Sequence, residues 1–257
     1  MPTANVNGIR LNYEITGEGE PVILITGFAG TTAFWSNTVP MLSDNYKVIT
    51  LDNRGTGLTK YNGQFTIQDL ADDVVSLMDH LSIFKAHVVG WSMGTTIAHR
   101  MALKYPERID TLTFISPYAK RPARSSYIMN TAIQLVQEGA DFDHFSKILN
   151  SFCFSEDVFT QKEKKGSKIK LSPKMDINGI ADQMRALDPY DGRWDMKDVP
   201  FKVLVIHGTK DIMVSPWIGE KIAAALKGSK LIMVPGAGHI IHPSDYIMFV
   251  KEHISRK

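Results

Sequence analysis

Short apolar segments alternate with helix-like segments along most of the chain, and this alternation constrains the fold more than any other feature. Six strand-like runs lie at residues 21–27, 46–52, 86–90, 111–116, 201–208 and 230–236. Most are apolar throughout, a pattern typical of parallel strands that are buried on both faces. We therefore predict an α/β fold, with a mostly parallel central sheet flanked by helices and joined by right-handed crossovers.

The segments between these runs carry helical patterns. Residues 67–81 place apolar side chains at spacings of three and four, at Leu70, Val74, Leu77, Met78 and Leu81. Thr66 followed by Asp69 is typical of an N-terminal helix cap. Similar helices are expected at 93–104, 216–226 and 244–254. The opening segment, residues 9–21, alternates like a hairpin edge.

The alternation stops between residues 119 and 198, where helical patterns continue without core-type strands. We expect this segment to be a helical cap, or lid, inserted into an α/β core made of residues 1–118 and 199–257. The basic run "QKEKKGSKIK" (161–170) is interpreted as a solvated helix end or loop, in preference to a ligand-binding patch.

Composition narrows the class of protein. The 257 residues are 44% hydrophobic and 22% charged, with a net charge of +2, which is typical of a folded globular protein. The near balance of charge argues against nucleic acid or an acidic membrane as the main partner. Cys153 is the single cysteine, so an intrachain disulfide and a Cys-rich zinc site are excluded. With neither an export signal nor a spanning run, we expect a cytoplasmic protein; its oligomeric state is left open.

The stretch "HVVGWSMGTTIAHR" (87–100) places Ser92 between Gly90 and Gly94, where a strand-like run gives way to a helical pattern. A serine hydroxyl is a poor nucleophile unless a base takes its proton and donors stabilise the developing oxyanion. A tight strand-to-helix turn lifts the side chain above the carboxyl edge of the sheet, and the helix that begins near Met93 directs free N–H groups there. The alternative is a packing turn with an incidental serine.

In this setting "GWSMG" resembles the nucleophile elbow of the α/β-hydrolase superfamily. The resemblance covers nearly the whole chain, through "TGFAG", "LDNRGTGLT", "HGTKDIMV" and "PGAGHIIHPSD", each of which follows a predicted strand. The order of motifs in the family implies Ser92 as nucleophile, Asp211 as acid and His239 as base. The acid would hold one tautomer of the histidine, which would shuttle the proton.

Other residues compete for these roles. Three aspartates flank the end of the insertion without directly following a clear core strand: Asp188, Asp191 and Asp195. His242 lies three residues beyond His239, but no cluster of Asp or Glu is spaced to complete a metal site with them. Two further histidines are interpreted as structural, His207 at a strand end and His99 in the helix behind the serine.

The resemblance also implies an oxyanion hole formed by the backbone N–H groups of Phe28 and Met93. Thr26 stands where a histidine is usual, and Thr95 where a second glycine often follows the elbow. Because the donors are backbone groups, Thr26 should change the support of the loop and not remove the hole; its hydroxyl would need a partner if buried. "DNRGTG" (52–57) is interpreted as a structural turn, in preference to a phosphate cradle.

A serine nucleophile implies an acyl-enzyme route, and carboxylic esters fit it best. Relatives that open epoxides or remove halide carry aspartate at the elbow, so Ser92 argues against both reactions. Lactonase, thioesterase, aminopeptidase, carbon–carbon bond hydrolase, perhydrolase and a non-enzymatic small-molecule receptor remain alternatives. We expect a cofactor-free, metal-free esterase acting on a small-molecule ester. The expected substrate-binding residues are Phe28, Trp35, Tyr127, Met129, Phe152 and Phe154.

Overall fold

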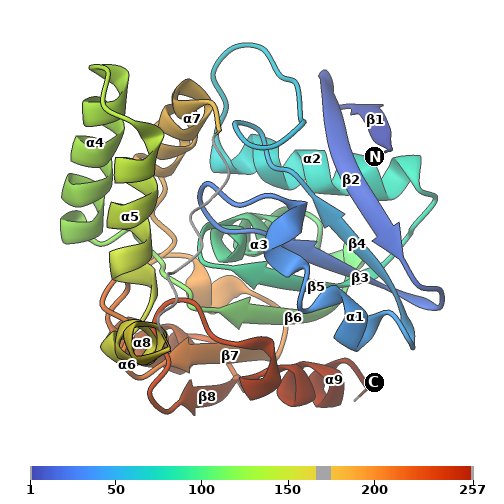
Figure 1. The fold of residues 1–257 in the computed structure, drawn as a ribbon. Coiled ribbons are helices and arrows are strands. Elements are labelled where there is room, and N and C mark those ends of the chain that lie inside the picture. The colour runs from blue at the N-terminus through green and yellow to red at the C-terminus, as the bar shows by residue number, and fades with distance from the viewer. Residues whose placement is uncertain (1, 166–174, 256–257) are drawn as a thin grey trace.

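The computed structural model describes residues 2–165 and 175–255, and in these ranges eight strands form one sheet in the order β1-β2-β4-β3-β5-β6-β7-β8 (Figure 1). The strands are β1 (Thr3–Val6), β2 (Ile9–Thr16), β3 (Glu20–Ile25), β4 (Tyr46–Leu51), β5 (Ala86–Trp91), β6 (Ile109–Ile115), β7 (Val203–Gly208) and β8 (Lys230–Val234). Every pairing from β4 to β8 is parallel, whereas β2 pairs antiparallel with β1 and β4. The predicted fold class, a mostly parallel sheet flanked by helices, is confirmed.

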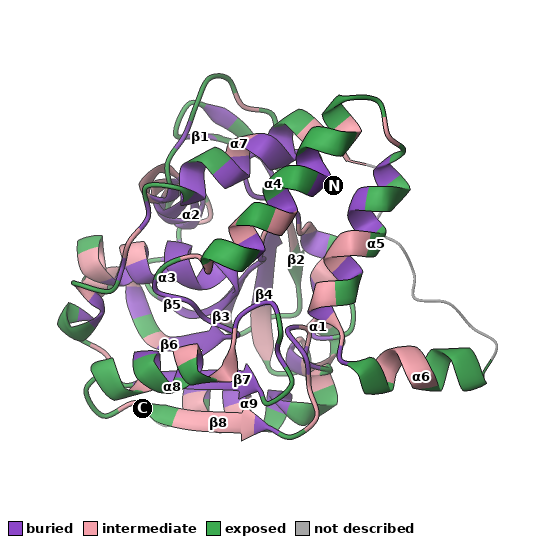
Figure 2. Ribbon diagram, turned by 90° about the vertical axis from the view of Figure 1, so that its left-hand side faces the viewer, coloured by how far each residue is buried: buried purple, intermediate pink, exposed green. Residues whose placement is uncertain are grey.

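Helices cover both faces of the sheet. They include α1 (Val39–Leu42), α2 (Ile67–His80), α3 (Met93–Lys104), α8 (Pro216–Ala225) and α9 (Ile247–Ser255). Neighbouring strand residues point to opposite faces: Ile23 joins the core cluster shared with α2, α3 and α8, and Leu24 joins the cluster shared with α1 and α9. Figure 2 shows buried residues concentrated in the central strands. Burial on both faces explains why these strands are apolar at every position.

The cap predicted for α2 is present. Thr66 Oγ1 accepts a hydrogen bond from the Asp69 N–H at 3.2 Å, and Asp69 Oδ2 accepts one from the Thr66 N–H at 2.7 Å. The segment expected to be a hairpin edge forms β2, which pairs antiparallel with β1 in a hairpin and with β4 on its other side. The sequence analysis missed β1, a four-residue strand in which only Ala4 and Val6 are buried.

Between β6 and β7 the chain forms helices α4 (Ala123–Gln137), α5 (Phe142–Cys153), α6 (Glu156–Lys164) and α7 (Ile177–Leu187). Figure 1 shows α4, α5 and α7 beyond the carboxyl ends of β6 and β7. The described part of residues 119–198 contains no strand. The division into core and cap stays a prediction. Of the basic run, residues 161–165 are exposed and 166–170 lie outside the described residues.

Across the described ranges, no helix has both the length and the apolar character that crossing a membrane requires.

The turn that follows β4 is held by buried polar contacts. Asp52 accepts hydrogen bonds from the N–H groups of Thr32 at 2.8 Å and Leu58 at 2.9 Å. Arg54 forms two hydrogen bonds with Asp73 on α2, Nε to Oδ2 at 2.7 Å and Nη2 to Oδ1 at 2.8 Å. Burial raises the pKa of Asp73, and the Arg54 hydrogen bonds oppose that rise. These contacts support the structural interpretation of "DNRGTG".

The Arg54→Met variant should therefore be strongly destabilised, because it leaves Asp73 buried without its cation. We expect the free energy of unfolding, measured by urea titration, to fall by about 3–5 kcal/mol. Lys230→Met is the matched control, since it removes an ion pair with Glu252 whose side chains are both exposed, and should cost no more than about 1 kcal/mol. Equal losses in the two variants would contradict the prediction.

Candidate active site

Ser92 occupies a tight turn between β5 and α3, with φ 51° and ψ −114°. A positive φ is rare for a residue with a side chain and is kept only where the surroundings enforce it. A Cβ added at Gly90 would lie 2.4 Å from the Gly94 carbonyl oxygen, and one at Gly94 would lie 2.2 Å from the Ile25 oxygen. Only glycine fits at both positions, as predicted for the elbow.

The three predicted triad residues lie together at the carboxyl edge of the sheet. His239 Nε2 is 2.8 Å from Ser92 Oγ, and His239 Nδ1 is 2.7 Å from Asp211 Oδ2. Asp211 follows β7, His239 follows β8, and all three side chains are buried. Because a carboxylate only accepts hydrogen bonds, Nδ1 carries the hydrogen and Nε2 is free to accept the serine proton.

Asp211 has two further partners besides His239. Its Oδ1 accepts the Val214 N–H at 2.8 Å, and its Oδ2 lies 3.2 Å from His207 Nε2, which also lies 2.9 Å from the Val214 carbonyl oxygen. Burial alone would raise the pKa of Asp211, but His239 and His207 outweigh it and lower the pKa to about 2. The carboxylate therefore stays ionised.

His207 is a residue whose contact with the acid the sequence analysis missed. It was interpreted as structural because it ends a strand, yet its Nε2 must donate to the Val214 carbonyl and so faces Asp211 as a donor. Its Nδ1 is buried and has no partner among the described residues, and a Cβ at Gly219 would lie only 2.5 Å from that atom. The spacing in "HGTKD" was the available signal.

The two predicted oxyanion donors flank the nucleophile. A Cβ added at Gly27 would lie 3.2 Å from Ser92 Cβ, which places the Phe28 loop against the serine, and Met93 is the first residue of α3. In the described part of the chain no acceptor is recorded for either N–H, whereas the neighbouring Ala29 N–H donates to Gln183 Oε1 at 2.9 Å. Both N–H groups thus remain available to an oxyanion.

The two threonines that depart from the family pattern support the backbone around the serine. Thr26 is fully buried, and its hydroxyl accepts a hydrogen bond from Asn53 Nδ2 at 3.1 Å, so the expected partner is present. Thr95 Oγ1 donates to the Ser92 carbonyl oxygen at 2.6 Å.

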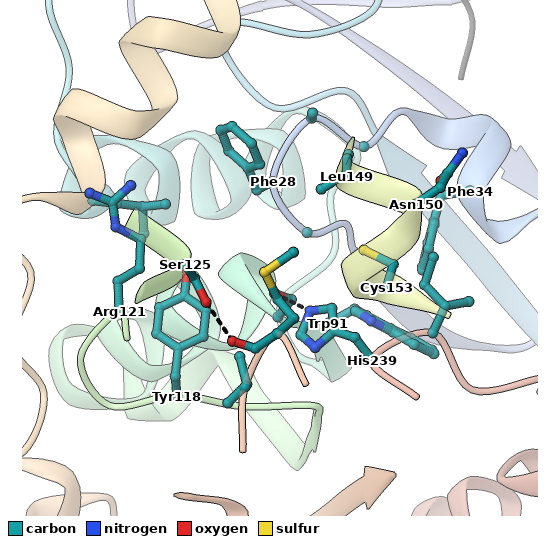
Figure 3. Close-up of a pocket in the computed structure, with 18 of the residues that line it drawn as sticks. Phe28, Phe34, Trp91, Tyr118, Arg121, Ser125, Leu149, Asn150, Cys153 and His239 are labelled. Atoms are coloured by element: carbon teal, nitrogen blue, oxygen red, sulfur yellow. Dashed lines mark hydrogen bonds between the residues drawn. The ribbon is translucent and has the colours of Figure 1, made fainter. Parts of the chain in front are cut away.

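Ser92 and His239 open onto a cavity of about 400 Å³ (Figure 3). Its walls are mostly apolar, and Phe28 and Phe154 are among them, as predicted. Polar side chains that the sequence analysis did not select also line it: Thr31, Ser36, Tyr118, Arg121, Ser125 and Asn150. Tyr118 follows β6, the strand beside β5, so its position after a central strand was a usable signal.

Four of the predicted substrate-binding residues are not among the described residues that line this cavity. Trp35 is fully buried beneath Phe34 and Trp91, with ring centroids 5.0 and 5.8 Å away. Tyr127 is 78% exposed, Met129 is buried in the core, and Phe152 packs against that core. Their helices turn these side chains either to solvent or to the interior.

The aspartates and histidines that competed for the roles of acid and base have partners outside the triad. The three rival aspartates pair with arginines: Asp188 with Arg121, Asp191 with Arg193, and Asp195 with Arg100. His242 is exposed and accepts a hydrogen bond from the Ser244 N–H, and His99 Nδ1 lies 3.0 Å from Tyr190 Oη. Within residues 2–165 and 175–255, no group of three or more His, Cys, Asp or Glu side chains is arranged to hold a metal ion.

The depressed pKa of Asp211 predicts a pH-dependent contribution to stability. The folded value of about 2 lies below the ordinary 3.8, so ionised Asp211 stabilises the fold above about pH 4, and this contribution is lost as the pH falls toward 2. The difference in free energy of unfolding between wild type and Asp211→Asn should therefore shrink by about 2 kcal/mol between pH 5 and pH 2. Urea titrations across that range measure it; a constant difference would refute the prediction.

Comparison with known proteins agrees with this geometry. The enol-lactonase from Burkholderia xenovorans LB400 has a similar fold, with a TM-score of 0.88, 24% identity and 100% of both chains covered. A thermophilic esterase from Thermogutta terrifontis, solved with malate bound, has a TM-score of 0.84 and 25% identity, over 99% of this chain and 97% of its own. A Mycobacterium tuberculosis protein, provisionally named a non-heme bromoperoxidase, is 28% identical over 90% of this chain and 91% of its own.

A sequence model described as the alpha/beta hydrolase fold matches residues 20–246, which is most of the chain. With the sheet order, the elbow and the three clustered side chains, this match identifies the family. The protein belongs to the α/β hydrolase family.

Proposed function

We propose that the protein is a serine hydrolase that cleaves carboxylic esters through an acyl-enzyme intermediate. The observation that carries this proposal is the continuous hydrogen-bonded chain from Ser92 Oγ to His239 at 2.8 Å and from His239 to Asp211 at 2.7 Å. A serine hydroxyl in contact with an oriented imidazole is the arrangement that nucleophilic acyl transfer requires.

In the first half of the reaction Ser92 Oγ attacks the ester carbonyl carbon while His239 Nε2 takes the hydroxyl proton. The carbonyl oxygen becomes an oxyanion, which accepts hydrogen bonds from the backbone N–H groups of Phe28 and Met93. When the carbon–oxygen bond breaks, the alcohol leaves with the proton from His239. Asp211 stabilises the imidazolium and keeps the ring oriented.

In the second half His239 removes a proton from a water molecule, and the resulting hydroxide attacks the acyl-enzyme. The second oxyanion uses the same two N–H donors, and the acid departs as the proton returns to Ser92. Lactones contain the same bond in cyclic form and follow the same steps. The small cavity with mostly apolar walls suits an ester with a small or medium acyl group. Separately, the single cysteine favours a cytoplasmic location for the protein.

The Ser92→Ala variant tests the nucleophile. Turnover of p-nitrophenyl butyrate should fall at least roughly 1000-fold, because the residue that forms the covalent bond is gone. Ser151→Ala, which removes an exposed hydroxyl on α5 outside the cavity, is the control and should retain wild-type turnover. A fluorophosphonate should add its mass to Ser92 in wild type. Multiple turnover by Ser92→Ala, or labelling of a different residue, would end the proposal.

His207→Leu tests the second histidine. A hydrogen bond to a charged group contributes about 1.5–3 kcal/mol, so kcat/KM should fall roughly 10- to 100-fold. His207→Gln should recover part of the loss, because its amide can still donate to Asp211. His99→Leu is the matched control, since His99 is equally buried but is bonded to Tyr190 and not to the acid. Equal losses of kcat/KM in His207→Leu and His99→Leu would show that His207 acts only through packing.

A further inference from the structure

Three polar side chains gather at the end of the cavity next to α4. Tyr118 and Arg121 lie on the segment between β6 and α4, and Ser125 lies in the first turn of α4. Figure 3 shows these three side chains on one side of the cavity, with His239 on the other side. A ligand with one end at Ser92 can therefore reach a polar group with its other end.

The Tyr118 hydroxyl is a donor on the wall of the cavity. The residue is 4% exposed and lines the cavity, yet its Oη has no hydrogen-bond partner in the described part of the chain. Burial raises the pKa of Tyr118, so the phenol keeps its hydrogen at physiological pH. In a largely apolar cavity, such a hydroxyl is one of the few groups that can fix the orientation of a polar ligand.

Arg121 is a charged group whose donors are only partly used. Its side chain is 11% exposed. Nη2 contacts Asp188 and Nη1 donates to the Met184 sulfur, whereas Nε has no acceptor in the part of the chain that the structure describes. A thioether is a weak acceptor, and methionine is flexible enough to move aside for a stronger one. Asp188 is itself 58% exposed, so water screens part of its charge from the guanidinium.

The charges of the residues that line the cavity favour a ligand with a single negative charge. Among the described residues that line the cavity, Arg121 is the one with a permanent charge, and none is Asp or Glu. A carboxylate matches one guanidinium and one phenol, because it carries one charge and accepts hydrogen bonds in its plane. A phosphate monoester carries nearly two charges and would need further cations.

Ser125 fixes this polar end relative to the triad. Its Oγ donates to the Met213 carbonyl oxygen at 2.5 Å, and Arg124 Nη2 donates to the Ile212 carbonyl oxygen at 2.7 Å. Both acceptors belong to the loop that carries Asp211. The start of α4 is therefore tied to the catalytic acid, which sets the span between the two ends of the cavity.

We propose that the acyl part of the substrate ends in a carboxylate, which Tyr118 and Arg121 bind while Ser92 attacks the ester or lactone carbonyl at the other end. The substrates would be monoesters of dicarboxylic acids, or lactones that carry a second, free carboxylate. This inference rests on the proposed ester hydrolysis and adds the substrate class.

Two esters of equal acyl length test the proposal, mono-p-nitrophenyl glutarate with a free carboxylate and p-nitrophenyl pentanoate without one. We expect wild type to prefer the glutarate, with a kcat/KM ratio of at least about 10, and Arg121→Met to lower that ratio roughly 10- to 100-fold. Tyr118→Phe should lower it by roughly 2- to 10-fold, since one neutral hydrogen bond is lost. Arg121→Lys keeps the charge, so its kcat/KM ratio should lie between those of wild type and Arg121→Met.

Two control variants separate carboxylate recognition from loss of structure. Asp188→Asn removes the same ion pair as Arg121→Met but keeps the guanidinium. Its ratio of kcat/KM for the glutarate to kcat/KM for the pentanoate should therefore equal or exceed that of wild type. Arg185→Met removes an arginine of α7 that does not line the cavity, and its ratio should not change. A fall of the ratio in Asp188→Asn as large as in Arg121→Met would mean that the ion pair acts structurally, and would overturn the proposal.

Binding to the Ser92→Ala protein gives a readout that does not depend on turnover. Monomethyl glutarate should bind in calorimetric titration, and its affinity should fall at least roughly tenfold when Arg121→Met is added. If wild type hydrolyses both esters but prefers the pentanoate in every variant, the carboxylate inference fails and the proposed hydrolysis stands. If neither ester is hydrolysed while binding depends on Arg121, the hydrolysis fails and the ligand class stands. Absence of binding would overturn the inference in either case.

Discussion

The active site depends on a close backbone contact between the turn after β5 and the end of β3. Gly94 lies against the Ile25 carbonyl, and Gly27 lies against Ser92, at distances that leave no room for a Cβ without a shift. Ser92 has a positive φ at this contact, and the two residues predicted to supply oxyanion donors, Phe28 and Met93, directly follow Gly27 and Ser92. Nucleophile and oxyanion donors are thus positioned by the main chain before any side chain is considered.

The loop after β7, which carries Asp211, contacts both the triad histidine and the beginning of α4. Asp211 is oriented by the Val214 N–H and by His207, and it orients His239 in turn. The carbonyl groups of the same loop receive the hydrogen bonds from the beginning of α4. The beginning of α4, which lines the cavity, and the carboxylate are therefore held by the same loop.

The sequence was sufficient to predict features with a short-range physical signature. Strands buried on both faces are apolar at each position, Thr66 and Asp69 form a cap across three residues, and the elbow needs small residues on both sides of Ser92. The resemblance to a known family then supplied Asp211 and His239. These positions follow strand ends, where a parallel sheet gathers its functional side chains.

Residues on the helices between β6 and β7 could not be assigned in the same way. Whether Met129 or Tyr127 faces the cavity depends on how α4 is rotated against its neighbours, and a helical period leaves that rotation undetermined. The placement of Trp35 was undetermined for a related reason. Aromatic character does not distinguish a side chain in the cavity wall from one in the ring cluster behind that wall. His207 lies four residues before Asp211, and that spacing alone did not show that the two side chains meet.

The chain leaves the sheet after β6 and re-enters it at β7, and these two strands are direct neighbours, with Leu112 opposite Val203. The excursion therefore interrupts no pair of hydrogen-bonded strands. Insertions, deletions or wholesale replacement of the intervening helices can accumulate there while the ladder beneath is preserved. Such changes can alter the cavity walls that these helices contribute, while the strands that precede Ser92, Asp211 and His239 stay in place.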